Sequence, residues 1–324
     1  MKKLTSVILA VAMLVLALAL ASCGKKTYTD VEARTFALSG PTGMGIAKLM
    51  DDAANGKAAL NYKFEIMTNP TQIVPEVVAG RFELAAVPVN LAATLLNKGA
   101  DISLVAVNTL GVLYLIERGN TVNSVSDLAG KTVYATGQGS TPEYILRYLL
   151  NKAGIEDKVE IVFLSDGAEV ASNLVAGKAD IGFLPEPAVS SAMMQDKEGA
   201  LRVALDISAE WNKVSDTPIV QGVIIASNTF IKEHGDALDA FLKEYKASTE
   251  YAVSNVKEAA ALIEKYAILP KAAVAERALP KCNIVCYVGN EAKKAASDMM
   301  KVLFDANPAS VGGKLPGDDF YYVK

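Results

Sequence analysis

The segment Val78-Ala79-Gly80-Arg81-Phe82-Glu83-Leu84-Ala85 occurs a second time, 97 residues later, as Val175-Ala176-Gly177-Lys178-Ala179-Asp180-Ile181-Gly182. In each copy an apolar stretch ends at a glycine, and a second apolar run begins four residues after that glycine. A glycine that closes an apolar helical stretch is typical of a helix C-cap, and the short run that follows is typical of a buried strand. Each copy therefore predicts a helix followed by a strand.

The same spacing relates a longer stretch around these segments. It relates Thr35 to Thr132, Gly40 to Gly137, Phe64–Met67 to Ile161–Leu164 and Pro88 to Pro185. A constant spacing without a gap over about fifty positions predicts two copies of one βαβαβ-type unit, and hence two similar lobes. Ligands of open α/β sheets bind beyond the carboxyl ends of the strands, so the cleft between the lobes is the expected place for a small molecule.

Residues 1–22 have the pattern of an export signal. Lys2 and Lys3 precede an unbroken apolar run, Val7–Ala21, which is too short to span a bilayer comfortably. The run ends in Leu20-Ala21-Ser22-Cys23, which resembles a bacterial lipoprotein processing site. The resemblance implies cleavage before Cys23 and a lipid on its thiol, whereas the alternative is a plain secretory signal with a chance cysteine. Residues 23–32 are then the lipidated cysteine and a polar tether, with folded structure beginning near Ala33.

Length and composition exclude several classes of protein. Removal of residues 1–22 from the 324 leaves 302, which suits two lobes of ordinary domain size. The net charge of −4 argues against a nucleic-acid partner. No later apolar stretch is long enough to span a membrane, so membrane contact is expected through the lipid alone. The single histidine, His234, lies in a polar turn without a nearby nucleophile, so we predict no catalytic residue, metal or cofactor.

The order of strand-like and helical patterns predicts an α/β protein with two lobes, each a mixed sheet flanked by helices. The chain is expected to cross to the second lobe near Glu117–Asn120 and to return at Gln221-Gly222, within a strand over Ile219–Ala226. Lobe 1 is therefore discontinuous, comprising residues 33–117 and 223–324, and lobe 2 comprises residues 118–222.

Three features together resemble one family. They are the glycine-rich turn Ser39–Gly45, the paired segments quoted first, and Asn228–His234 followed by Ala240-Phe241-Leu242. They are similar to the substrate-binding proteins of ABC importers, in the branch that includes alkanesulfonate, nitrate, taurine and thiamine-pyrimidine binders. The resemblance covers nearly all of the chain after Cys23. It implies a type II periplasmic-binding-protein fold with a two-stranded hinge and a ligand enclosed as the lobes close.

The resemblance also implies partners and a location. A monomeric receptor of this kind delivers a small-molecule ligand to an ABC permease and its ATPase. A lipid anchor at the outer face of the cell membrane, extracellular or periplasmic, would keep the receptor at high effective concentration beside the permease. Two rival interpretations stay open: a receptor of another uptake or sensing system, and an enzyme on the same fold. The export signal argues against the enzyme, since such enzymes work in the cytoplasm.

Two equivalent loops are the main candidates for ligand binding. Ser39-Gly40-Pro41-Thr42-Gly43 precedes the first helix of lobe 1, and Gly137-Gln138-Gly139-Ser140-Thr141 precedes the first helix of lobe 2. Glycines let a ligand approach the backbone closely, and helix N-termini favour anionic or polar acceptors. Simple turns with capping residues are the alternative. The candidate residues are Ser39, Gly40, Thr42, Gly43, Gln138, Gly139, Ser140 and Thr141.

Two further pairs of loops and one hinge residue complete the predicted site. A proline after a buried strand forces an extended turn, which brings the next polar side chain to the cleft edge. This argument selects Asn90 and Glu186, which follow the paired Pro88 and Pro185. The remaining candidates are Asn69, Asp166 and the hinge residue Gln221, and helix capping at a turn is the alternative role for the residues of both loop pairs.

The charges of these loops favour one class of ligand. None of the six loops contains Lys or Arg, which argues against a strongly anionic ligand held by a salt bridge, although amides and hydroxyls can hold a sulfonate. Asp166 and Glu186 suit N–H donors or a positive group. A nitrogenous heteroaromatic, such as a thiamine-precursor pyrimidine, is therefore favoured over a sulfonate. The candidates for a stacking wall are Tyr114, Tyr134, Phe183, Tyr287 and above all Trp211, which lies in polar surroundings; a place in the core is the alternative for each of them.

Two late features have open interpretations. Cys282 and Cys286 are either two semi-buried thiols, a disulfide across a turn, or a metal site that lacks further ligands nearby. The segment Gly312–Tyr322 is too aromatic for a free linker, so we expect it to pack on lobe 1, with permease docking as the alternative role.

Overall fold

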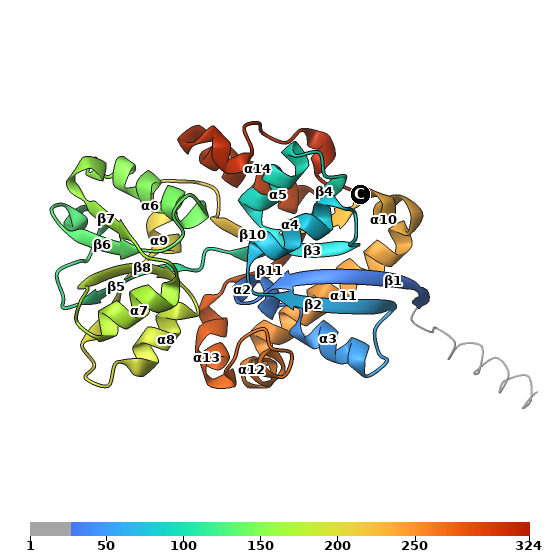
Figure 1. The fold of residues 1–324 in the computed structure, drawn as a ribbon, viewed down its shortest axis with the longest axis horizontal. Coiled ribbons are helices and arrows are strands. Elements are labelled where there is room, and N and C mark those ends of the chain that lie inside the picture. Colours follow the sequence, from blue (N-terminus) through green and yellow to red (C-terminus); the bar gives the residue numbers. More distant parts are fainter. Residues whose placement is uncertain (1–26) are drawn as a thin grey trace, which may run out of the picture.

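The computed structural model describes residues 27–324 and has two α/β lobes side by side (Figure 1). The predicted export signal and Cys23 lie outside the described residues. Lobe 1 is built from the beginning and the end of the described chain, and lobe 2 from its middle. Within residues 27–324 no helix has the length and apolar character needed to cross a membrane.

Lobe 1 contains a six-stranded mixed sheet in the order β11-β4-β10-β3-β1-β2. β1 is parallel to β2 and β3, whereas β10 is antiparallel to β3 and β4, and β11 is antiparallel to β4. The central strands are buried almost throughout, as expected of strands that are covered by helices on both faces. The strands are β1 (Tyr28–Leu38), β2 (Leu60–Met67), β3 (Leu84–Pro88), β4 (Ile102–Leu110), β10 (Val220–Ser227) and β11 (Ile284–Val288).

Lobe 2 contains a five-stranded sheet in the order β7-β6-β8-β5-β9. β6 is parallel to β7 and β8, and β5 is antiparallel to β8 and β9. The strands are β5 (Leu113–Arg118), β6 (Thr132–Ala135), β7 (Glu160–Phe163), β8 (Ile181–Pro185) and β9 (Leu201–Asp206).

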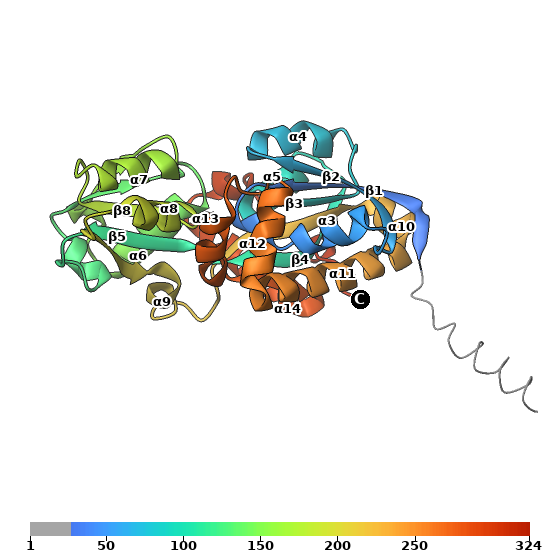
Figure 2. The same cartoon turned by 90° about the horizontal axis from the view of Figure 1, so that it is seen from below.

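Helices cover both faces of each sheet (Figures 1 and 2). In lobe 1, α4, α5 and α14 pack on one face, and α3, α11 and α12 contribute to the core on the other. Lobe 1 holds α2 (Pro41–Met44), α3 (Ala47–Ala54), α4 (Pro70–Val78), α5 (Val89–Asn97), α10 (Asn228–Glu233), α11 (Gly235–Ser254), α12 (Val256–Lys265), α13 (Ala272–Ala278) and α14 (Gly289–Ala306). Lobe 2 holds α6 (Thr141–Lys152), α7 (Gly167–Val175), α8 (Ala188–Gln195) and α9 (Ile207–Trp211). Short 3₁₀ turns cover Val125–Leu128, Glu156–Lys158, Leu279–Lys281, Pro308–Val311 and Asp318–Phe320.

The repeated segment forms the same elements in both lobes. α4 and α7 begin and end 97 residues apart, and so do β3 and β8. Each helix is followed by a glycine with positive φ, 66° at Gly80 and 67° at Gly177, a conformation that other residues adopt at a cost. The repeat therefore predicted this helix–strand pair correctly.

The repeat is not free of gaps at the first strand of each lobe. Thr35 pairs with Phe64 in β2, but Ile161, which lies 97 residues after Phe64, pairs with Val133. The first strands are therefore related by 98 residues, so the predicted match of Thr35 to Thr132 is wrong.

The loops after these strands also differ in length. The N-cap of α2 is Gly40, whereas the N-cap of α6 is Ser140, so the match of Gly40 to Gly137 is wrong as well. The cause is extra chain in the loop of lobe 2, which places two positive-φ residues, Gly137 and Gly139, before its helix.

Three predicted boundaries are corrected by the strand pairing. The tether was expected to reach residue 32, but β1 begins at Tyr28, where the strand pairs with Leu60. β5 belongs to the sheet of lobe 2, so the first crossing lies at Gly111-Val112 rather than near Glu117. The second crossing ends at Ile219, because Gln221-Gly222 already lies in β10 of lobe 1. The strand β11 was not predicted.

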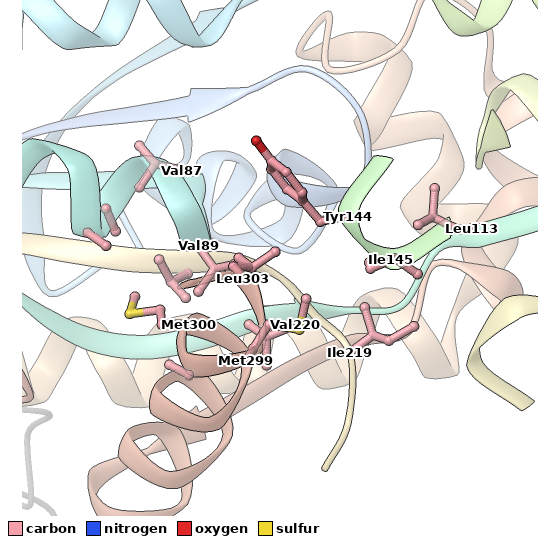
Figure 3. Close-up of a cluster of buried hydrophobic side chains, with 14 of the residues drawn as sticks. Val87, Val89, Leu113, Tyr144, Ile145, Ile219, Val220, Met299, Met300 and Leu303 are labelled. Carbon is pink, nitrogen blue, oxygen red and sulfur yellow. The ribbon is translucent and has the colours of Figure 1, made fainter. Parts of the chain in front are cut away.

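One apolar core extends through both lobes. It includes Leu113 at the first crossing, Ile145 of α6, Ile219 at the second crossing and Met299 of α14, all buried (Figure 3). Side chains from α14 in lobe 1 and α6 in lobe 2 thus meet around the two crossings. The hinge region is packed with apolar side chains, which leaves polar recognition to the loops beyond the strand ends.

The C-terminal segment packs on lobe 1, as predicted. The amide of Tyr322 donates to the carbonyl of Leu104 in β4 at 2.9 Å, and the ring of Phe320 is buried. The Nδ2 atom of Asn97 donates to the carbonyls of Val311 and Lys314, both at 2.7 Å. Cys282 and Cys286 are free thiols, which agrees with the first of their three interpretations.

Candidate functional site

The carboxyl ends of the parallel strands in both lobes lie at the edges beside the chain crossings. β10 begins where the chain re-enters lobe 1 and runs antiparallel to β3 and β4, so those strands end at that edge. β5 begins where the chain enters lobe 2 and runs antiparallel to β8, so the parallel strands β6, β7 and β8 also end beside a crossing. The six candidate loops therefore lie on the two sheet edges at the junction between the lobes.

The loop of lobe 1 that contains Ser39, Gly40, Thr42 and Gly43 is a tightly packed turn. The amide of Ser39 donates to the carbonyl of Met67 at 2.8 Å, and that of Gly40 to the carbonyl of Ile268 at 3.2 Å. A Cβ atom on Gly43 would lie 2.1 Å from the carbonyl oxygen of Leu38, so this glycine is required by packing. Two of the backbone donors expected for a ligand are thus already used within the protein.

Thr42 connects this turn to the end of β4. The Nδ2 atom of Asn108 donates to the carbonyl oxygen of Thr42 at 3.0 Å, and the hydroxyl of Thr109 donates to Oδ1 of Asn108 at 3.1 Å. Asn108 is 1% exposed. Both the nitrogen and the oxygen of this buried side-chain amide are hydrogen-bonded, so Asn108 fixes the position of Thr42 at the sheet edge.

The loop of lobe 2 is more open and is bonded mainly to itself. The amide of Gly139 donates to Oε2 of Glu143 at 2.7 Å, and the hydroxyl of Ser140 donates to the carbonyl of Gly137 at 2.5 Å. Gln138 and Gly139 are exposed. Thr141, the first residue of α6, is 3% exposed, and its Oγ1 atom has no hydrogen-bond partner.

Gln221, which was predicted as a hinge residue and lies in β10, has a similar unpaired group in lobe 1. It lies at an irregularity of β10 between Val220, which pairs with Leu110, and Gly222, which pairs with Thr109. Its Nε2 atom is buried without a partner. Leaving a buried polar group unpaired costs about 1–3 kcal/mol, so Thr141 and Gln221 carry polar atoms that a bound molecule could pair.

Three other candidates take part in local hydrogen bonds. Asn69 and Asp166 are exposed N-caps of α4 and α7: Asn69 Oδ1 accepts from the amide of Thr71 at 2.9 Å, and Asp166 Oδ1 accepts from the amide of Glu169 at 2.8 Å. Asn90 is half-buried, and its carbonyl accepts from the hydroxyl of Thr94 at 2.9 Å. Capping is sufficient to explain Asn69 and Asp166.

Glu186 is the one charged candidate that is fully buried. Its carboxylate accepts from the amide of Ser190 at 3.1 Å and from the hydroxyl of the same residue at 3.0 Å. The ammonium group of Lys281, which belongs to lobe 1, lies 3.6 Å from Oε1. Burial raises the pKa of Glu186, and the bonds from Ser190 and the charge of Lys281 oppose that rise. The carboxylate is thus held by partners from both lobes.

Trp211 does not offer a stacking face, and the prediction for it is wrong. It is fully buried, its indole N–H donates to the carbonyl of Thr217 at 2.7 Å, and its ring packs against Tyr148 at 4.7 Å between centroids. Its polar neighbours in the sequence misled the prediction, because α9 turns Ile207 and Trp211, four residues apart, toward the core.

The other aromatic candidates do not form one wall. Phe183 is fully buried and Tyr114 is 7% exposed. Tyr134 lines a cavity of about 420 Å³ with Arg118 and Lys178, at the end of lobe 2 away from the crossings, and Tyr287 lines a groove beside α11. Tyr114 is the aromatic candidate nearest to the junction, since its hydroxyl donates to the carbonyl of Lys281 at 3.1 Å.

A cavity of about 910 Å³ opens between the lobes beside the loop of lobe 2. Gln138 and Gly139 line it together with α6 and the end of α14. The side chain of Asn307 crosses this boundary and donates to the hydroxyl of Tyr144 at 3.1 Å. Two predicted residues therefore border an interlobe cavity, while the other predicted residues lie outside its lining.

The sequence did not indicate Asn108 or Lys281 as part of the site. Asn108 ends the apolar run Val105-Ala106-Val107, and a polar residue at the end of a buried strand is a signal that could have selected it. Lys281 follows a helical stretch, and nothing in its local sequence indicates that it reaches the other lobe.

The two mixed sheets, the discontinuous first lobe and the crossings between sheet edges define a type II periplasmic-binding-protein fold. A scan against protein families matches the description "NMT1/THI5 like" over residues 57–259. The chain belongs to this family. No curated protein matches the sequence significantly.

Solved structures show the same fold at low sequence identity. An ABC transporter protein from Parabacteroides distasonis is 23% identical, with a TM-score of 0.77 over 93% of this chain and 100% of that one. The periplasmic aliphatic sulphonate binding protein SsuA from Escherichia coli is 19% identical, with a TM-score of 0.69 over 88% and 92%. The periplasmic nitrate-binding protein NrtA from Synechocystis PCC 6803 is 12% identical, with a TM-score of 0.59 over 89% and 83%.

Proposed function

We propose that this protein is the solute receptor of an ABC importer and binds a small organic molecule between its lobes. The observation that carries this proposal is the pair of unpartnered buried atoms, Thr141 Oγ1 in lobe 2 and Gln221 Nε2 in lobe 1. Each lies at the sheet edge beside a crossing. A ligand that bonds to both atoms contacts both lobes, and such a ligand favours the closed arrangement because it pairs both groups only there.

The wider assignment is supported by the export signal and by the similar structures. The proteins from Escherichia coli and Synechocystis PCC 6803 are described as periplasmic binding proteins, which fits a chain with an export signal. We propose that Cys23 carries the lipid and holds the receptor at the outer face of the cell membrane, beside its permease and ATPase. Two acyl chains give stable membrane attachment, whereas one does not.

The charges at the junction favour a ligand without strong net charge. Lys281 lies beside the buried carboxylate of Glu186, so neither charge is left uncompensated. The unpaired groups are a hydroxyl, which donates and accepts, and an amide nitrogen, which donates. We therefore propose a nitrogenous heteroaromatic such as a thiamine-precursor pyrimidine as the first ligand class to test, and a sulfonate as the second.

Thermal unfolding of the chain from Lys25 onward, which contains every described residue, tests the proposal. The panel consists of thiamine precursors, sulfonates, riboflavin, amino acids, amines and nitrate. A ligand that binds the native state raises the unfolding midpoint with concentration. We expect a shift for one class, and loss of that shift in Thr141→Val and Gln221→Met.

Matched controls separate binding from general effects on stability. Thr132→Val removes a hydroxyl of lobe 2 that donates to Glu160, and Gln195→Met removes an exposed amide of α8 that donates to Ser191. Both controls should keep the full ligand-induced shift. A shift that survives in Thr141→Val and Gln221→Met would show that the ligand binds elsewhere.

A further inference from the structure

The segment Leu279–Asn283 belongs to lobe 1 and makes non-covalent contacts with lobe 2. Its 3₁₀ turn packs on α11, α12 and α13, and α13 in turn packs against α8 of lobe 2 (Figure 2). The hydroxyl of Tyr114 in lobe 2 donates to the carbonyl of Lys281 at 3.1 Å. The ammonium group of the same lysine lies 3.6 Å from Glu186, also in lobe 2. Both the backbone and the side chain of Lys281 therefore contact the other lobe.

The end of this segment is fixed to the first crossing. Asn283 has a φ of 43°, in the left-handed region that asparagine tolerates better than most residues. Its Nδ2 atom donates to the carbonyl of Gly111 at 2.5 Å, and its own carbonyl accepts from the amide of Leu110 at 3.1 Å. Lys281 is therefore two residues from an asparagine that is hydrogen-bonded to the first crossing. The distance between Lys281 and Glu186 thus depends on how the two lobes are arranged about that crossing.

The side chain of Glu186 is 0% exposed, and its charge requires compensation. Within its own lobe it is paired by Ser190, which supplies hydrogen bonds but no positive charge. Among residues 27–324, Lys281 is the cation that lies within ion-pair distance of this carboxylate. A buried ion that loses its counter-charge is strongly destabilising, whereas replacement of both charges by neutral groups is often tolerated.

We propose that Lys281 and Glu186 form an interlobe charge clasp: Lys281 supplies the counter-charge that allows lobe 1 to cover the carboxylate of lobe 2. The lobes then close when Lys281 reaches Glu186 and move apart when it does not. This inference concerns the lobe movement that the proposed receptor function requires, but its test needs no ligand, so the clasp and the receptor function can fail separately.

Distances between spin labels on the two lobes, measured by pulsed electron resonance on the unliganded chain from Lys25 onward, test the clasp. The labels replace Lys57 in lobe 1 and Lys197 in lobe 2, both exposed, in a Cys286→Ser background. Cys282 is fully buried and is left in place. Lys281→Met keeps the length of the side chain without its charge, and we expect it to add a population at longer distance.

The double variant Lys281→Met/Glu186→Gln distinguishes charge from packing. It removes the uncompensated carboxylate while a neutral amide of the same size remains beside Ser190, so the distance distribution should return to that of the unaltered chain. Lys294→Met breaks an ion pair with Asp298 inside α14 and should change nothing. An unaltered distance distribution in Lys281→Met would overturn the proposal. It would also be overturned if the double variant showed the same longer-distance population as Lys281→Met. Circular dichroism of each variant confirms that the distances come from folded protein.

Discussion

The side-chain oxygen of Asn108 lies 2.4 Å from the position that a Cβ atom on Gly222 would occupy. Oγ1 of Thr109 would lie at 3.1 Å from the same atom. The end of β4 therefore approaches β10 so closely that residue 222 must lack a side chain. Because Asn108 also bonds to Thr42, this approach links β10 to the candidate loop of lobe 1.

Gly222→Ala should destabilise the protein by about 1–3 kcal/mol, the usual cost of an added methyl group in a packed interior. The displaced amide of Asn108 would also lose its bond to Thr42, so ligand affinity should fall together with stability. Urea unfolding measures the first effect. The control is Gly235→Ala at the start of α11, where a Cβ atom meets nothing within 4 Å, and it should change stability by less than about 0.5 kcal/mol. Equal stability of the two variants would contradict the close approach.

Thr141→Val should stabilise the unliganded protein although Thr141 lies in the proposed site. The hydroxyl is buried without a partner, so its replacement by a methyl group of similar size removes an unpaired polar atom. We expect a gain of about 1 kcal/mol in the free energy of unfolding, measured in urea. Thr132→Val removes a hydroxyl that is bonded to Glu160 at 2.7 Å, so this control should lose stability or leave it unchanged. A loss in Thr141→Val would mean that the hydroxyl is paired in solution.

The repeat predicted much of the architecture because it records local structure. The segments around Gly80 and Gly177 specify a helix, a left-handed turn and a buried strand through their own residues, and the structure keeps their spacing of 97 residues. The first strands lost this match because the chain between the first and second strands is one residue shorter in lobe 2, although the loop before α6 is longer than that before α2: Thr35 and its partner Phe64 are 29 residues apart, and Val133 and its partner Ile161 are 28 apart. Loop length is set by the turn and by helix packing, and a comparison of residues at constant spacing does not detect it.

The candidate site was less predictable because its determinants are not local. Thr141 was selected as part of a loop before a helix and Gln221 as a hinge residue, and both carry an unpaired buried atom. Trp211 was selected for polar neighbours, yet the helical period places it in the core. The partnership of Lys281 with Glu186 joins positions far apart in the chain, and only the packing of α13 against α8 brings them together.

Phe320→Ala should destabilise the protein strongly, because this ring fastens the C-terminal segment to lobe 1. The ring is 2% exposed and lies beside Tyr321, at 5.2 Å between centroids. Truncation of a buried phenylalanine costs about 3–5 kcal/mol. Val323→Ala in the same segment is the control, since Val323 is 42% exposed, and it should have little effect on the urea midpoint. If Phe320→Ala were as stable as this control, the segment would not be part of the fold in solution.

The carboxyl group of Glu186 should make stability depend on pH in a direction opposite to that of most acids. Burial raises its pKa above the ordinary value of 4.5, so the folded protein binds this proton more tightly than the unfolded chain does. The contribution of Glu186 to stability is therefore complete below pH 4.5 and is lost as the pH rises through the folded pKa. Lys281 opposes this loss, and the neighbouring Cys282 and Tyr114 stay neutral because burial raises their pKa values as well.

The measurement compares the unaltered chain with Glu186→Gln, which cannot ionise, in urea at intervals between about pH 4 and pH 8. The stability of the unaltered chain relative to the variant should fall as the pH rises across this range. Asp127→Asn is the matched control, because its pKa is lowered by bonds from the amide of Asn123 and from Ser124. Its contribution is already present above the ordinary aspartate pKa of 3.8, so the stability of the unaltered chain relative to Asp127→Asn should stay nearly constant across this range. A gain of the unaltered chain over Glu186→Gln would mean that Lys281 and Ser190 outweigh the burial of the carboxylate, and that Glu186 is ionised at little cost when the lobes are closed.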